Sequence, residues 1–229
     1  MTLQELINAV ILKATGKPTI LASNNTKWEK IRGIANFYQQ AWAHEPGQHW
    51  RSLYNVESLG TITSDSSMYQ IPYYVDEVST AFGDNIFIRT TDGKKVEFEL
   101  VDHDDFERHL AGNYCAIIGH EEADGEFVVF NRSFAEGDPC YGGELFVPVY
   151  YKTGDLVNAD DVVYVDDPYW LVTMCAAEYI RNDIVKQNQY GNLIAEANNL
   201  MTGMIRRNRA GQVRHIRGSF HNGGGLNYD

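Results

Sequence analysis

Carboxylate and imidazole side chains are most concentrated between residues 102 and 109 of this 229-residue chain. The run Asp102-His103-Asp104-Asp105 is followed by Glu107 and His109, and this mixture suits a divalent metal or a general base. The spacing matches neither an HExxH motif nor an EF-hand loop. The same acids would also begin a short helix over 104–111, where they satisfy free N–H groups before Gly112 ends the helix. We favour the helix start over a catalytic or metal site.

The chain has three cysteines: Cys115, Cys140 and Cys175. They are odd in number, widely spaced and without a CxxC pair, so neither a disulfide framework nor a zinc ribbon is indicated. A cysteine nucleophile would need a histidine such as His103 or His120, yet no signature of such a site accompanies the cysteines. Since Cys115 lies in the apolar run 114–118, we expect it to pack in a core.

Two further patterns associated with ligands are weak. Gly142-Gly143 precedes a strand pattern and the glycines at 223–225 stand at the end of the sequence, so neither would hold a phosphate at a helix N-terminus. Tyrosines are frequent in the middle of the chain; they suit a binding face but are also good strand formers. We therefore predict no catalytic residue, no metal and no cofactor.

Charge separates the body of the chain from its end. The formal net charge is −12, which argues against a protein that coats nucleic acid. From Ala197 onward there are five arginines and one acid, for a net charge of +4, so residues 1–196 carry −16. No apolar run approaches the roughly 18 residues that cross a bilayer, and the first twelve residues lack signal-peptide features. We expect synthesis in the cytoplasm and no membrane partner.

The first 50 residues predict a helical pair. Thr2 and Glu5 have capping-box spacing at the start of an amphipathic helix over 2–14, and Gly16 would end it. A second helix is predicted from Ser23-Asn24 to about His44, because apolar residues recur there at helical spacing.

Between residues 51 and 165 apolar side chains recur at every second position, and this spacing predicts an inserted β-rich domain. The Asp92-Gly93 pair between two alternating runs is a hairpin signal. Further strands are expected at 114–118, 126–130, 144–151 and 162–165. Because Pro148 lies inside one of these runs, we expect that strand at an edge or bulged. The module is predicted to be an antiparallel sandwich or barrel.

A second helical hairpin is predicted after this insertion. Asp167 and Pro168 supply an N-cap and a first-turn proline, 186–192 reads as a tight connection, and a return helix ends near Gly211. The predicted fold is thus α+β: a helical bundle of 1–50 and 166–211, the β-rich insertion, and an extended basic tail over 212–229. That tail cannot build a core by itself.

One stretch resembles the head-to-tail adaptor proteins of tailed bacteriophages. The resemblance lies in Val147-Pro148-Val149-Tyr150-Tyr151, Leu156, Asp160-Asp161, the run Asp166-Asp167-Pro168-Tyr169-Trp170-Leu171-Val172, and Ala176-Ala177. In these adaptors the closing strand of an inserted β module runs into an aromatic-rich helical hairpin. The order of elements agrees over nearly the whole chain, although the β module is larger than the smallest adaptors carry.

The resemblance implies a structural virion protein of the neck and not an enzyme. Such a subunit forms a homo-oligomeric ring, implied to have twelve members, beneath the portal of the capsid. It joins the capsid to a downstream tail, nozzle or stopper protein, and DNA passes through the channel without specific binding during genome ejection. The implied portal-docking residues are Arg214, Arg217, Phe220, Leu226 and Tyr228. Packing between the helices of neighbouring subunits is assigned to Trp170, Tyr179, Met201 and Met204.

Two other classes of function remain open from the residues alone. A small metal-dependent or hydrolytic enzyme would use the 102–109 cluster and would retain a metal through purification. A monomeric ligand-binding β module would need an aromatic groove and would show no concentration-dependent assembly.

Overall fold

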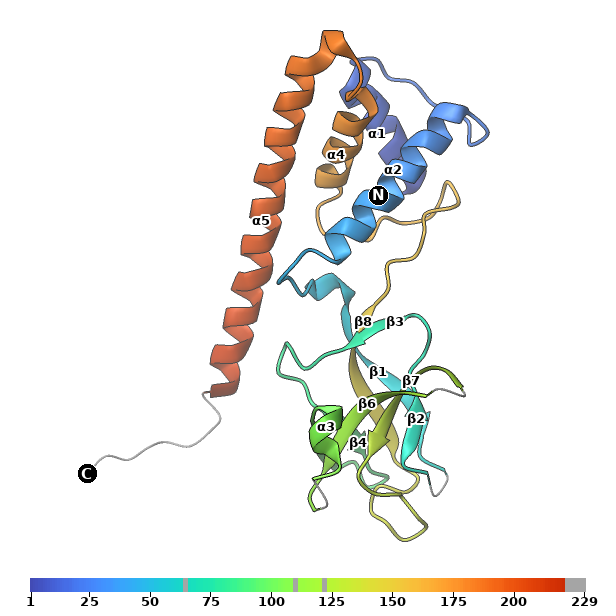
Figure 1. Cartoon of the computed structure of the whole chain (residues 1–229), viewed down its shortest axis with the longest axis vertical. Helices are drawn as coiled ribbons and strands as arrows, with labels where there is room; N and C mark the ends of the chain where they lie inside the picture. Colours follow the sequence, from blue (N-terminus) through green and yellow to red (C-terminus); the bar gives the residue numbers. More distant parts are fainter. Residues whose placement is uncertain (64–65, 109–110, 121–122, 221–229) are drawn as a thin grey trace, which may run out of the picture. The chain divides into compact units, whose positions relative to one another are not determined.

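The structure is a computed structural model that describes the backbone of residues 1–63, 66–108, 111–120 and 123–220, and the side chains of these residues except 120, 123, 124 and 210–220. The chain is α+β and divides into two compact units (Figure 1). One, the helical unit, consists of Met1–Leu53 and Thr153–Val213; the other, the β unit, contains Tyr54–Lys152. Residues 153–165, expected in the β-rich part, group with the helices.

The helical unit contains α1 (Leu3–Thr15), α2 (Thr26–Ala43), α4 (Pro168–Ile180) and α5 (Gln187–Phe220), with short 3-10 turns η1 (Arg51–Leu53) and η2 (Ile184–Lys186). The predicted capping box is confirmed, because the Glu5 N–H donates to Thr2 Oγ1 at 3.3 Å and the Thr2 N–H donates to Glu5 Oε2 at 2.9 Å. Gly16 ends α1 at a φ of 71°. The start of α4 is also as predicted, with Asp167 accepting from the Tyr169 N–H and Pro168 in the first turn.

The amide side chains of α2 hold the segment that returns from the β unit, residues 153–167, here called the return segment. Asn36 bonds both backbone groups of Leu156, donating to its carbonyl at 3.1 Å and accepting from its N–H at 2.8 Å. Buried Gln39 donates to the Gly154 carbonyl and accepts from the Tyr164 N–H, each at 3.0 Å. Regular α2 thereby supplies the hydrogen bonds that an irregular segment cannot make with itself.

The return segment also completes the start of α1. The N–H groups of Leu3 and Gln4 donate to the carbonyls of Asp161 and Ala159 at 2.8 and 2.9 Å. With the capping box, these bonds satisfy the N–H groups that the first helical turn leaves free. The predicted strand over 162–165 is wrong: Val162 makes only an isolated bridge with Thr2, because α2 and the N-terminus use the backbone groups that a strand would need.

The C-terminal helix differs from the sequence prediction at both ends. The connection after α4 is formed by residues 181–186, so Gly191 lies inside α5 and not in a turn at 186–192. Lys186 Nζ and Gln189 Nε2 donate to the Ala14 and Lys13 carbonyls, which fastens the first turn of α5 and offsets the roughly 1 kcal/mol that a helical glycine costs. The helix continues to Phe220 instead of ending near Gly211, since no proline stops its propagation. The predicted extended tail from 212 is therefore wrong up to Phe220.

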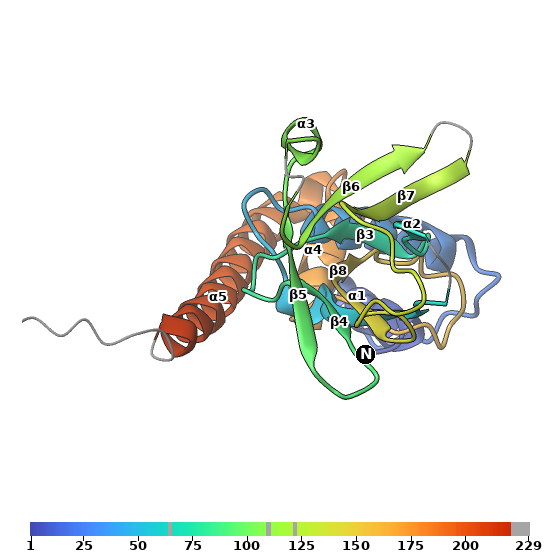
Figure 2. The ribbon, with the colours of Figure 1, turned by 90° about the horizontal axis from the view of Figure 1, so that it is seen from below.

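The β unit is a curled mixed sheet that forms a half-barrel. Its strands are β1 (Tyr54–Thr61), β2 (Met68–Gln70), β3 (Val75–Val78), β4 (Ile86–Arg89), β5 (Lys95–Leu100), β6 (Tyr114–His120), β7 (Ala123–Phe130) and β8 (Glu144–Tyr151). The order is β1-β8-β4-β5-β6-β7-β2, and β3 also pairs with β8 (Figure 2). The Asp92-Gly93 hairpin joins β4 to β5 as predicted. Among the described pairings only β5–β6 is parallel, because a crossover through α3 (His103–Phe106) separates these strands.

Pro148 lies in a central strand, so of the two arrangements expected the edge strand is wrong, whereas ladder irregularities are present opposite β8, between Ser58 and Gly60 of β1 and between Val75 and Glu77 of β3. β8 pairs with β1 along one side, and along the other it pairs with β4 through Phe146 and with β3 from Val149. The Pro148 carbonyl accepts from the Ser79 N–H on that second side. The N–H that proline lacks would have pointed the same way, where pairing with β4 has ended and pairing with β3 is beginning.

The hydrogen bonds of Gln39 give a stability prediction. Replacing Gln39 by Leu leaves a partly buried carbonyl and a partly buried N–H without their side-chain partner, which we expect to cost about 1–3 kcal/mol. Urea unfolding followed by circular dichroism measures this loss. Lys27→Ala, at an exposed position of the same helix, is the control and should change stability by less than about 0.5 kcal/mol. Equal stabilities for the two variants would show that the return segment is held by other contacts.

Candidate functional site

The acidic run Asp102-His103-Asp104-Asp105, together with Glu107, forms an exposed surface turn. α3 is a single turn, His103–Phe106, and does not extend over 104–111 as predicted; Asp102 precedes it without a side-chain capping bond. Asp105 pairs with Arg108 at 2.7 Å, and the exposed His103 lies 3.7 Å from Asp104. His109 falls outside the described residues. Within the part that is described, no three His, Cys, Asp or Glu side chains come together in a way that could hold a metal ion.

The three cysteines are buried free thiols. Burial raises the pKa of Cys115 to about 12 and also raises that of Cys175. The pKa of Cys140 is raised by burial too, although Arg132 Nη2 lies 3.7 Å from its sulfur. A nucleophilic cysteine needs a lowered pKa and access to substrate. The thiols are held protonated in the core and His103 is exposed on the surface, so these groups do not form the pair that nucleophilic catalysis requires; the side chain of His120, the other candidate, is outside those described.

Several tyrosines of the β unit donate hydrogen bonds to carboxylates of the same unit. Tyr151 and Tyr74 both donate to the Glu57 carboxylate, the second at 3.3 Å, and Tyr54 donates to Asp84 at 2.6 Å. Tyr73 is the exception: it is 89% exposed and lines a hollow of about 320 Å³ with Pro72, Asp76, Glu126 and Lys152 among others. A single aromatic ring beside mixed charges is not the aromatic groove that a ligand-binding module would need.

Several exposed aliphatic side chains lie at one end of the helical unit. There the turn between α4 and α5 meets the end of α1 (Figure 1), where Lys186 bonds the Ala14 carbonyl. Four side chains form what we call the apolar tip: Leu12, Ile20, Ile184 and Val185. Ile184 and Val185 are neighbours in sequence and are 87% and 93% exposed, and a separate hollow of about 340 Å³ on α1 and the segment after it is lined by Leu12, Pro18 and Ile20 among others. Exposed apolar side chains that lie together, as Ile184 and Val185 do, mark a site of interaction.

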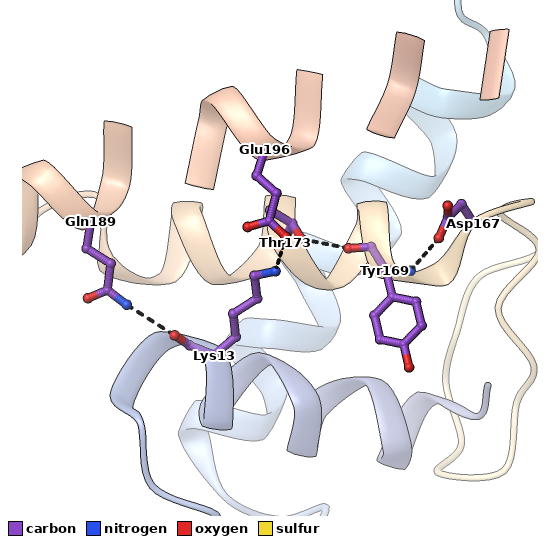
Figure 3. Close-up of polar contacts among 6 residues, drawn as sticks. All are labelled: Lys13, Asp167, Tyr169, Thr173, Gln189 and Glu196. Atoms are coloured by element: carbon purple, nitrogen blue, oxygen red, sulfur yellow. Dashed lines mark hydrogen bonds and ion pairs between the residues drawn. The ribbon is translucent and has the colours of Figure 1, made fainter. Parts of the chain in front are cut away.

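The helix α5 adds a second surface to the same unit. Its buried side chains are Leu193, Ala197, Met204 and Asn208, at helical spacing along one stripe. Lys13 of α1 pairs with Glu196 at 2.6 Å, and Gln189 bonds the Lys13 carbonyl, so the helix is fixed along α1 (Figure 3). On the outer side Arg206 and Arg209 are exposed, whereas Arg207 reaches Asp167 at 3.4 Å.

The residues predicted to pack between subunits divide by burial. Trp170 and Met204 are already buried within the chain, whereas Met201 and Tyr179 are half-buried and Lys30 lies 5.2 Å from the Tyr179 ring centre. Arg214, Arg217 and Phe220 belong to α5 by backbone, and their side chains are not among those described; Leu226 and Tyr228 lie beyond the described residues. Sequence reasoning missed the apolar tip because Ile184 and Val185 fit the helical apolar pattern of α4.

No family model matches the sequence, and no curated protein matches it. In the described residues, none of the helices is both long and apolar enough to cross a membrane. The function therefore has to be argued from the surfaces of the chain itself.

The buried Cys115 thiol predicts loss of stability at alkaline pH. Below its ordinary pKa of 9.0 both the folded and the unfolded chain keep the proton; between 9.0 and about 12 only the unfolded chain releases it, so unfolding becomes easier as the pH rises. We expect the unfolding free energy from urea titration to fall between about pH 8 and about pH 10.5, less steeply in Cys115→Ala. Tyrosines contribute equally to both proteins. The same pH slope for both would contradict this assignment.

Proposed function

We propose that this chain is a structural virion protein, the head-to-tail adaptor of a tailed bacteriophage. It would form a homo-oligomeric ring in the neck, beneath the portal and above a tail, nozzle or stopper protein. The proposal rests first on the resemblance described above. The order of elements supports it: a helical pair, a β unit, then an N-capped aromatic helix and a long final helix.

The finer architecture belongs to the same proposal. We take α1, α2, α4 and α5 as the helical bundle of such a subunit, and the curled sheet as its inserted module. The chain enters the β unit after Leu53 and leaves it before Thr153, as an insertion requires. A ring of these subunits would present the acidic body, −16 over residues 1–196, to passing DNA without gripping it.

The apolar tip is the observation that carries the proposal. Two adjacent aliphatic side chains as exposed as Ile184 and Val185 cost solubility in an isolated subunit, and they are expected where another protein covers them. An assembly subunit has such a partner by definition. The exposed acidic turn and the buried thiols, by contrast, favour neither hydrolytic nor metal chemistry.

Replacement of the tip tests this proposal. In Ile184→Asn/Val185→Asn we expect unchanged thermal unfolding, because both side chains are already exposed, and at least about a tenfold loss of affinity for the ring or a candidate portal protein. Native mass spectrometry of the subunit alone and with that portal measures the loss. Met68→Ser, at an exposed position of β2, is the matched control. A monomer that binds sugar or retains stoichiometric metal would instead favour one of the two alternatives.

Removal of residues 212–229 tests the predicted portal-docking segment. Its proposed contacts are Arg214, Arg217, Phe220, Leu226 and Tyr228, since arginine and aromatic side chains contribute most to interfaces. We expect thermal unfolding to stay within about 0.5 kcal/mol of the full chain while portal binding is lost. A truncated chain that unfolds early yet still binds would assign this segment to the subunit's own core.

A further inference from the structure

A hollow in the return segment combines exposed apolar side chains with free acids. Its volume is about 390 Å³, and Val157, Val162 and Tyr164, which are among its lining residues, are 54%, 61% and 47% exposed. The hollow is preformed, because Asp161 accepts from the N–H groups of Val157 and Asn158 at 2.6 and 2.7 Å. The Gln39 amide fixes both ends of the same segment, at Gly154 and at Tyr164.

Two exposed carboxylates accompany this hollow. Asp155 lines it and Asp160 adjoins it in sequence, and both are exposed. Neither makes an ion pair or hydrogen bond with another side chain in the part of the chain whose side chains are described. Apolar surface rimmed by unpaired acids suits a partner that offers an aliphatic side chain beside cations.

The outer side of α5 offers that chemistry. Ile205 and Arg209 are one turn apart on one face, with Arg206 beside them. Both arginines are exposed and, among the described side chains, neither has an ion-pair partner, whereas Ile205 is only half-buried. Figures 1 and 2 place α5 and the hollow-bearing part of the return segment on opposite sides of the helical unit. One copy therefore cannot bring its own two surfaces together.

We infer that the hollow of one copy receives the Ile205–Arg209 face of α5 from a second copy. The Ile205 side chain enters between Val157 and Val162, and Arg206 and Arg209 pair with Asp155 and Asp160. Because the two surfaces differ and lie on opposite sides of one unit, the contact is heterologous and repeats from copy to copy until a ring closes. This inference deepens the proposed function, since it names the surfaces through which subunits of the ring meet.

Charge reversal on each surface tests the contact in the full-length protein. Arg206→Glu/Arg209→Glu and Asp155→Arg/Asp160→Arg should each weaken self-association at least tenfold in sedimentation velocity at low salt, with a smaller effect at high salt. An equimolar mixture of the two variants should assemble again, because every contact then joins opposite charges. Lys17→Glu/Lys27→Glu is the matched control, with the same change in net charge at exposed positions.

Three results of the self-association measurements would overturn the inference. These are a wild-type protein that stays monomeric up to about 1 mM, reversal variants that assemble like wild type, and a mixture that does not recover. Loss of DNA binding without loss of self-association in the Arg206/Arg209 variant would also overturn it and assign that face to nucleic acid. Portal binding is measured separately. If the wild-type protein assembles in a charge-dependent way but does not bind the portal, the adaptor proposal is refuted and the contact between copies is retained.

Discussion

The hydrogen bonds between the α2 amides and the return segment are the constraint on which the helical unit depends. Asn36 and Gln39 hold residues 154–164 through four hydrogen bonds of 2.8–3.1 Å to their backbone. The segment so held completes the first turn of α1 and delivers Asp167 to cap α4. It also shapes the hollow beside Val157 and Val162. An irregular stretch of chain therefore sets the position of three helices, because its backbone groups bond to the α2 amides on one side and to the N–H groups of Leu3 and Gln4 on the other.

Local sequence signals correctly predicted the helix starts and the turn that depend on residues close together in the sequence. The Thr2–Glu5 capping box, the Asp167-Pro168 helix start and the Asp92-Gly93 turn each depend on residues a few positions apart, and all three are present. The order of helices, strands and helices followed from periodicity. The parallel pairing of β5 with β6 and the central place of β8 depend on partners far apart in sequence, and no local pattern carries that information.

The candidate surfaces were harder to predict for the same reason. Apolar residues such as Ile184 and Val185 look alike in sequence whether a neighbouring helix covers them or not; only the turn between α4 and α5 shows that they are uncovered. The acids of 102–109 carried the stronger chemical pattern, and they form an exposed turn. Sequence also could not show that Asp155 lies at a hollow, because the segment that forms the hollow is held by α2, more than a hundred residues away along the chain.

The two ends of the β unit lie next to each other. Tyr54, where β1 begins, is the direct partner of Tyr150 in β8, and cross-strand neighbours in such a ladder are only about 5 Å apart. The chain therefore leaves the helical unit at Tyr54 and returns after Lys152 at nearly the same point, as it would if a short loop joined the two positions. A module joined in this way can grow, shrink or be exchanged over evolution without altering the packing of the helices.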